Sequence, residues 1–287
     1  MLDIQIMKNH QEIRKVFCEK FVLPKEAFEI QYKEWIEFAR SKGHELKYEE
    51  VLLWDKMPQY QPISFDRALD FLRDLNHPVY AMSEPEKPHE QGFTLDGTTH
   101  RGVVIQADSA ALAELIGYEW YEDWRLMEED CYLADAILPG DLYVFDPSME
   151  HLLVFTHEHD FWDLEITQPM VAAKSRYCMC HGFALPPASS YEELKAAFDA
   201  EVSKGTVMAV ECSYTTKRYY RAFTVCKRQS SDGKTGEYWF EHAPETRYSS
   251  IESLETAKAF YEDSLLSVSK NSTVRFEIHS VTYQNVL

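Results

Sequence analysis

Two short, uninterrupted apolar runs place the strongest constraint on the fold of this chain. Leu142–Phe145 and Leu152–Phe155 have the length and composition of β-strands. They are joined by Asp146-Pro147-Ser148-Met149-Glu150, and Asp, Pro and Ser are residues that favour turns. The sequence therefore predicts an antiparallel hairpin here, followed by a further strand over Arg176–Phe183.

The N-terminal segment shows helical periodicity instead. Pro24 is suited to the first turn of a helix, and Gly43 is suited to the residue that follows a helix end. Between them, aromatic and small residues recur at helical spacing: Phe28, Tyr32, Trp35 and Ala39. Ser64 is a good N-cap for a later helix. The apolar stripe of that helix is Phe65, Ala68, Leu69, Leu72 and Leu75.

A strand and a further helix are expected between this segment and the hairpin. Gly102–Ala107 reads as a short apolar strand, and Asp108 is suited to capping a helix over residues 109–130. Apolar residues at helical spacing support that helix: Leu112, Leu115, Ile116, Trp120 and Trp124.

Leu185–Ser189 reads as a linker, which predicts one domain over residues 1–185 and another over residues 186–287. The second domain begins with a capping box, Ser190 and Glu193, and strands follow at 206–215, 218–228 and 236–242. A helix after Ser249, lined by Leu254, Ala257, Tyr261 and Leu265, precedes a last alternating strand around Phe276. The fold class is therefore α+β. A helical N-terminal segment leads into a small, mostly antiparallel sheet, and a second αβββαβ domain follows.

Negative charge is concentrated in the first of these domains. Residues 1–185 hold 17 Lys or Arg and 34 Asp or Glu, a balance of −17, whereas residues 186–287 hold 12 and 14, a balance of −2. An acidic surface repels phosphates and anionic lipid and attracts basic partners. We therefore expect neither direct nucleic-acid binding nor membrane binding.

The cysteines and the hydropathy pattern favour a cytoplasmic protein. The six cysteines form no regular framework, and a chain of 287 residues does not need disulfides to support its core. No stretch approaches the ~20 apolar residues of a membrane span. Reduced thiols in the cytoplasm are the simpler interpretation.

A group of His and Cys residues is a candidate metal site. His157 and His159 are two residues apart beyond a strand, and Cys178, Cys180 and His181 follow in the next one. Because alternate residues of a strand face the same side, these side chains converge if the strands are neighbours. Zinc takes such ligands, although the spacing differs from C-x2-C and H-x3–5-H patterns. This site is the basis of one alternative, a metal-dependent hydrolase; the other interpretation is buried cysteines and no cofactor.

The helix over residues 109–130 interleaves acids with aromatic residues. Glu119 shares a helix face with both Glu122 and Asp123, and Tyr121 and Trp124 lie among them. Such carboxylates suit acid–base catalysis, cation binding or a protein-binding surface, or they form a simple solvated face. Glu128 and Glu129 extend the acidic run. The chain has no G-x-S-x-G, P-loop or G-x-G-x-x-G motif that would define a reaction.

The stretch Tyr118–His159 also carries a family resemblance. Its acidic, Trp-rich helix is followed by Asp141-Leu142-Tyr143-Val144-Phe145-Asp146, a turn, and Leu153-Val154-Phe155-Thr156-His157-Glu158. With its flanks, residues 102–178, it resembles small uncharacterised Firmicutes proteins of immunity-protein type; residues 186–287 show no resemblance. Because immunity proteins neutralise a toxin by binding it, the resemblance implies a binding role rather than catalysis.

These observations lead to one hypothesis about function. We expect an acidic intracellular protein-binding module of bacterial or phage origin. It would be an inhibitor, immunity or anti-defence protein that neutralises a basic partner such as a nuclease. The expected contact residues are Glu119, Tyr121, Glu122, Asp123, Trp124, Glu128 and Glu129. The sequence leaves the oligomeric state open.

Overall fold

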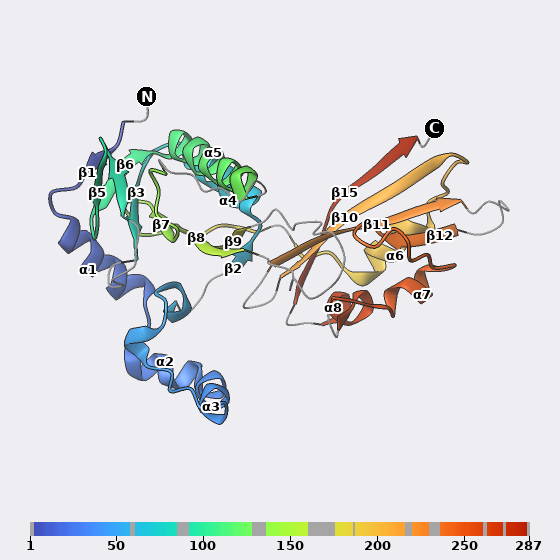
Figure 1. Ribbon diagram of the computed structural model, residues 1–287, viewed down its shortest axis with the longest axis horizontal. Helices are drawn as coiled ribbons and strands as arrows, with labels where there is room; N and C mark the ends of the chain where they lie inside the picture. Colours follow the sequence, from blue (N-terminus) through green and yellow to red (C-terminus); the bar gives the residue numbers. More distant parts are fainter. Residues whose placement is uncertain are drawn as a thin grey trace. The chain divides into compact units, whose positions relative to one another are not determined.

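The computed structural model describes residues 3–57, 61–84, 92–127, 136–159, 176–185, 187–215, 220–229, 236–260, 263–271 and 274–285. It divides into two compact units. The first contains Met1–Glu158 and Cys178–Phe183, and the second contains His159–Tyr177 and Ala184–Leu287. Both mix helices with antiparallel sheets, and helices near the N-terminus precede most of the first sheet (Figure 1). The predicted α+β class is confirmed.

The first unit is built on a seven-stranded sheet in the order β1-β6-β3-β7-β8-β9-β2. Its strands are β1 (Gln5–Ile6), β2 (Gln61–Ile63), β3 (Pro78–Ser83), β6 (Val104–Asp108), β7 (Leu142–Phe145), β8 (Leu152–His159) and β9 (Arg176–His181). The helices are α1 (His10–Phe21), α2 (Lys25–Gln31), α3 (Lys33–Ser41), α4 (Phe65–Asp74) and α5 (Ser109–Met127). A separate small hairpin consists of β4 (Phe93–Leu95) and β5 (Thr98–His100).

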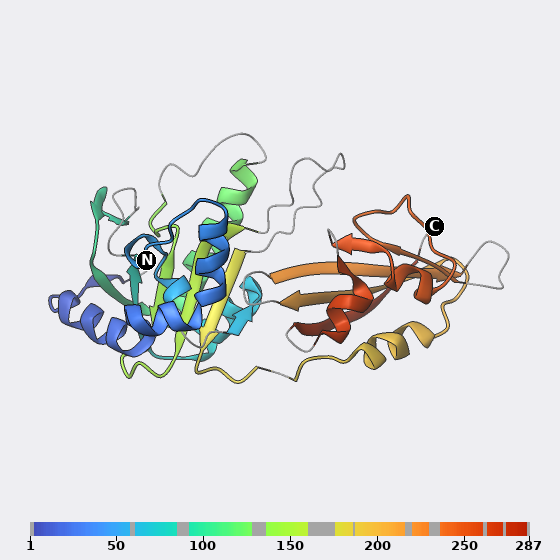
Figure 2. The ribbon, with the colours of Figure 1, turned by 90° about the horizontal axis from the view of Figure 1, so that it is seen from below.

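Helices cover both faces of the first sheet, with α1 on one side and α4 and α5 on the other (Figures 1 and 2). Phe17 of α1 packs against Tyr143 and Phe145, with ring centroids 6.0 and 4.8 Å apart. On the opposite face, Phe65 of α4 packs against Phe155, at 6.0 Å. All four residues of β7 are buried in consequence. Each large apolar side chain fully buried here contributes about 1.5–3 kcal/mol.

The predicted hairpin of β7 and β8 is confirmed, with Leu142 opposite Phe155. Its turn is held by Asp146, whose carboxylate accepts hydrogen bonds from the hydroxyl of Ser148 and from the backbone N–H groups of Glu150 (2.8 Å) and His151 (2.7 Å). Burial disfavours the ionised carboxylate, but these hydrogen bonds outweigh it and lower the pKa of Asp146 below its ordinary value.

The helix predicted between Pro24 and Gly43 is two helices, α2 and α3. The chain leaves helical geometry at Tyr32, whose ring packs with Phe28 and Trp35 at centroid distances of 5.0 and 6.0 Å. Gly43 ends α3 as predicted, at φ 82°, and donates its N–H to the carbonyl oxygen of Arg40. The left-handed backbone required there favours glycine.

The second unit is a four-stranded antiparallel sheet in the order β12-β11-β10-β15. Its elements are α6 (Tyr191–Asp199), β10 (Thr206–Thr215), β11 (Tyr220–Gln229), β12 (Gly236–Phe240), α7 (Ile251–Glu255), β13 (Lys258–Phe260), β14 (Asp263–Ser264), α8 (Leu265–Lys270) and β15 (Arg275–Asn285). Phe198, Leu254 and Leu265 bring the three helices onto the same face of the sheet. The capping box of Ser190 and Glu193 starts α6 as predicted.

One predicted helix of this unit is interrupted. The stripe from Leu254 to Leu265 is divided between α7 and α8, with β13 and β14 between them. The cap of α7 is Ser250 rather than Ser249. A second cap explains the interruption, because Ser264 and Ser267 exchange hydrogen bonds of 2.9 and 3.2 Å and start a new helix.

Candidate functional site

Helix α4 presents a row of three carboxylates to solvent. Ser64 caps the helix by accepting the N–H of Arg67 at 3.3 Å, which confirms the predicted start. Its apolar stripe is buried against the sheet and α5: Phe65, Ala68, Leu69 and Leu72. The exposed positions, four residues apart on the opposite side, are Asp66, Asp70 and Asp74. This row was not among the sequence-based candidates, although its spacing opposite the apolar stripe is the signal that reveals it.

Helix α5 adds two exposed aromatic side chains beside this row. Asp108 starts the helix by accepting the N–H of Ala111 at 2.9 Å, as predicted. Residues at helical spacing bury its inner side: Leu112, Ala113, Ile116 and Trp120. On the outer side, Tyr118 is 62% exposed and Tyr121 is 50% exposed. Glu114, one turn before Tyr118, is also exposed.

Side-chain bonds hold the two helices side by side. The hydroxyl of Tyr121 donates to Asp66 at 3.0 Å, at the start of α4. At the other end of α4, Arg73 reaches both Asp70 (3.0 Å) and Glu114 (3.2 Å). The helices are therefore antiparallel, and the acidic rows of both lie on one surface.

We define the acidic face as Asp66, Asp70, Asp74, Glu114, Tyr118, Tyr121 and half-buried Glu122. Among the side chains that the structure describes on the two helices, two cations lie beside these residues, Arg67 and Arg73, so these five carboxylates and two cations sum to −3. Desolvation, reinforced by the carboxylate of Asp66, raises the pKa of Tyr121. Its phenol consequently stays protonated and keeps donating to Asp66.

Glu119 requires a correction, because its side chain is buried rather than exposed to a partner. One carboxylate oxygen accepts the backbone N–H of Ile137 at 2.7 Å, and the other accepts that of Leu138 at 3.0 Å. The carboxylate satisfies two donors of a segment that has no regular secondary structure. Its role is therefore structural.

The other predicted contact residues of this helix are described only in part. Tyr121 and Glu122 belong to the acidic face. The backbone of α5 includes Asp123 and Trp124, whose side chains lie outside the described residues, as do Glu128 and Glu129 entirely.

The predicted metal residues lie on neighbouring strands, since β8 is next to β9 in the sheet. Cys178 and Cys180 are buried, and the ring of His181 packs edge-on against Phe21 with centroids 5.6 Å apart. The side chain of His159 lies outside the described residues.

His157 is instead held by a carboxylate. Its Nδ1 lies 3.0 Å from both oxygens of Asp141, and its backbone N–H donates to the same carboxylate at 2.7 Å. Among the side chains that the structure describes, no three His, Cys, Asp or Glu residues gather as metal ligands. The metal-dependent hydrolase therefore stays a prediction, because the side chain of His159 lies outside the described residues.

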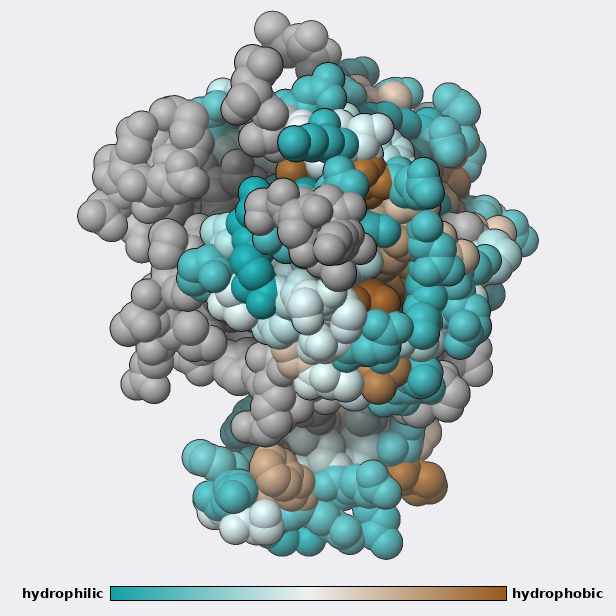
Figure 3. Space-filling view, turned by 90° about the vertical axis from the view of Figure 1, so that its right-hand side faces the viewer, coloured by the Kyte–Doolittle hydropathy of each residue, from teal (hydrophilic) through white to brown (hydrophobic). Residues whose placement is uncertain are grey.

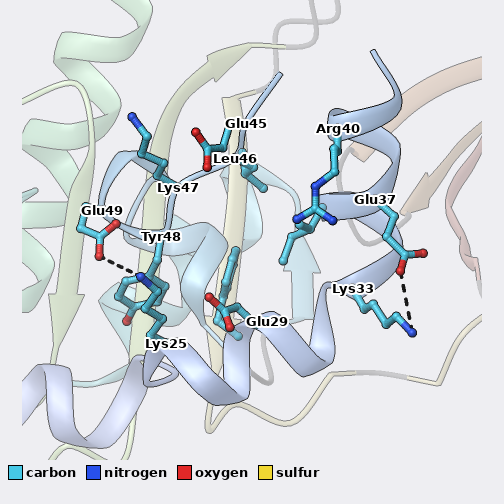
Figure 4. A pocket seen from close by; sticks show the side chains of 12 residues that line it. Lys25, Glu29, Lys33, Glu37, Arg40, Glu45, Leu46, Lys47, Tyr48 and Glu49 are labelled. Carbon is cyan, nitrogen blue, oxygen red and sulfur yellow. Dashed lines mark hydrogen bonds and ion pairs between the residues drawn. The ribbon is translucent and has the colours of Figure 1, made fainter. Parts of the chain in front are cut away.

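A pocket of about 540 Å³ lies between α2, α3 and the segment 45–49 (Figure 4). Phe28 and Ile36 contribute apolar surface, and charges of both signs surround them. These charges are largely paired internally, as in Lys25–Glu49 (3.4 Å) and Lys33–Glu37 (3.8 Å). Because the charges compensate each other, the lining selects neither an anion nor a cation.

Comparison with protein-family models, with curated proteins and with solved structures gives no match to this chain. The resemblance of residues 102–178 to immunity proteins therefore stays a prediction. Within the described residues, no helix combines the length and apolar character needed to cross a membrane.

Proposed function

We propose that this protein is a cytoplasmic binding protein that inhibits a basic partner, such as a nuclease, through the acidic face of α4 and α5. The observation that carries the proposal is the exposure of Tyr118 and Tyr121 among five carboxylates. Tyrosine is enriched at binding hot spots because it buries a large, rigid ring and still offers a polar group.

Charge supports the same choice of partner. The face belongs to the part of the chain with a balance of −17, so its field attracts cationic proteins over about one Debye length, roughly 8 Å at physiological salt. Enzymes that act on nucleic acids hold phosphates with clusters of Lys and Arg. A carboxylate surface is complementary to such a cluster and would exclude the substrate while bound. This competition for the basic site is the proposed mechanism of inhibition.

The test compares affinity-tagged full-length variants used to capture proteins from the native host. The first variant, Asp70→Lys/Asp74→Lys, reverses two charges of the face; the second, Tyr118→Ala, removes a ring. The matched control, Glu12→Lys/Glu29→Lys, makes the same change in net charge at exposed positions of α1 and α2. Poly-lysine serves as a probe of nonspecific attraction.

We expect the wild type and the control to retain one basic protein that both face variants lose. Removal of a hot-spot tyrosine costs about 2 kcal/mol, which is roughly a 30-fold loss of affinity. The charge reversals should mainly slow association, by about tenfold at low salt and less at high salt.

The second half of the test is activity. The retained protein should be a nuclease, or another enzyme of anionic substrates, that loses activity with one equivalent of wild type and keeps it with Tyr118→Ala. Equal capture of the partner by the control and by the face variants would refute the proposal that the acidic face is the binding surface. Capture without any loss of the partner's activity would refute inhibition.

A further inference from the structure

Strand β15 forms one edge of the second sheet and pairs along its length with β10 (Figure 1). With 11 residues, it is the longest of the strands that the structure describes in this unit. A strand edge presents unpaired N–H and C=O groups that can pair with another strand. Such an edge can pair with another strand unless a segment of the same protein bonds these groups.

The opposite edge of the same sheet is covered. There, Tyr238 of β12 donates its N–H to the carbonyl oxygen of Tyr248 at 2.9 Å and accepts from Tyr248 at 2.8 Å. The beginning of β15 is covered as well. Ser189 donates its N–H to Phe276 at 2.8 Å, and its hydroxyl accepts the N–H of Ile278 at 3.0 Å.

The end of β15 has no such cover among the described residues. From Val281 to Asn285, the described residues of the strand pair with β10 alone. Val281 is 40% exposed and Tyr283 is 55% exposed. Both point to the same face of the sheet, because they lie opposite Val210 and Met208, which belong to one core.

The chemistry of this segment suits pairing with an identical strand. Ile278–Asn285 contains no Lys, Arg, Asp, Glu or Pro, which are the residues that usually protect edges. Residues 186–287 carry a balance of only −2, so two copies of this unit repel each other little. On the face of the molecule in Figure 3, the coloured hydrophobic residues lie in small groups among hydrophilic ones.

We propose that the end of β15 pairs antiparallel with β15 of a second copy, about a twofold axis through Thr282. This register places Val281 opposite Tyr283 of the other copy, twice by symmetry, and the two Thr282 side chains opposite each other. Aromatic–β-branched pairs and Thr–Thr pairs both stabilise antiparallel strands. The short interface forms a weak, concentration-dependent dimer that presents two acidic faces.

The experiment is sedimentation velocity of the full chain from about 1 μM to about 1 mM, the range of a weak interface. Thr282→Lys and Thr282→Glu are measured alone and as an equimolar mixture. Thr282 is exposed, so both variants should fold, which circular dichroism verifies. The matched controls are Thr98→Lys and Thr98→Glu, at an exposed threonine of β5.

We expect the wild type and the Thr98 variants to dimerise equally. Each Thr282 variant places two like charges opposite each other and should weaken its own dimer, by roughly fivefold to tenfold. The mixture places Lys opposite Glu and should restore the dimer. A wild type that is monomeric throughout would overturn the proposal. If the Thr282 variants dimerised as strongly as the wild type, or if their mixture dimerised no more strongly than each variant alone, pairing through Thr282 would be refuted.

Discussion

Replacement of Glu119 by alanine tests most directly whether this residue holds the fold or binds a partner. The substitution removes the acceptors of two hydrogen bonds, from Ile137 (2.7 Å) and Leu138 (3.0 Å). Leu138 is buried, so its N–H has little access to replacement water. The substitution leaves unsatisfied donors in the interior.

The expected magnitude follows from these two bonds. Each hydrogen bond to a charged group contributes about 1.5–3 kcal/mol, so the loss of two should lower the free energy of unfolding of Glu119→Ala by about 3–6 kcal/mol. For a unit of this size that corresponds to a fall in Tm of about 6–24 °C. Glu119→Gln keeps one acceptor oxygen but turns an amide NH2 toward the other donor. Glu119→Gln should therefore lower the free energy of unfolding by roughly half as much as Glu119→Ala.

The assay is urea denaturation followed by tryptophan fluorescence, combined with hydrogen exchange of the two amides. Exchange at Ile137 and Leu138 should accelerate about 100-fold in Glu119→Ala if about 3 kcal/mol is lost locally. The control is Glu114→Ala on the same helix. Its exposed ion pair with Arg73 contributes less than about 1 kcal/mol.

Two results would refute this reasoning. If Glu119→Ala were no less stable than Glu114→Ala, the carboxylate would not hold the segment at Ile137. If it kept full stability but lost the captured partner, Glu119 would be a contact residue, as the sequence alone suggested.

Three further predictions concern the rest of the fold. Gly182→Ala should lower the free energy of unfolding by about 3 kcal/mol or more, because Gly182 has φ 84° and the added Cβ would lie 2.0 Å from the carbonyl oxygen of Glu150. Gly43→Ala should lower it by only about 1 kcal/mol, because Gly43 has a similar φ of 82° but open space around it. Equal urea midpoints for the two variants would contradict the predicted clash. Because the pKa of Asp146 is lowered, its ionised carboxylate stabilises the fold above about pH 4, and this stabilisation is lost as the pH falls through the folded-state pKa. Asp146→Asn should remove this part of the dependence of the unfolding free energy on pH. Parallel acid-unfolding profiles of the variant and the wild type would contradict the prediction. Burial raises the pKa of the Cys226 thiol to about 11, so iodoacetamide at about pH 8 should modify this cysteine only after unfolding in urea. Peptide mass spectrometry would measure the modification, and rapid labelling of Cys226 in the native protein would contradict the prediction.

Local signals in the sequence predicted many element boundaries. The caps at Ser64, Asp108 and Ser190 and the turn after Asp146 all lie where the sequence places them. Each depends on hydrogen bonds between residues three or four positions apart, which the local sequence specifies. Two boundaries were predicted wrongly: the N-cap of α7 is Ser250 and not the adjacent Ser249, and the helical pattern through Tyr32 is interrupted there.

The candidate site could be predicted only in part. The aromatic and acidic character of α5 is evident from the sequence, and Tyr121 and Glu122 lie on its outer surface. The partnership with α4 depends on contacts between positions far apart in the chain, such as Tyr121 with Asp66. A single helical pattern contains no information about which neighbour lies beside it.

The sequence by itself determined the periodicities, the caps and the unequal distribution of charge, because these are properties of neighbouring residues and of composition. Only the tertiary structure decided which carboxylates of α5 face solvent. Glu119 and Glu122 are one turn apart, yet Glu119 is turned inward by the N–H groups of Ile137 and Leu138. A buried donor must find an acceptor, and that requirement arises only when distant segments have packed together.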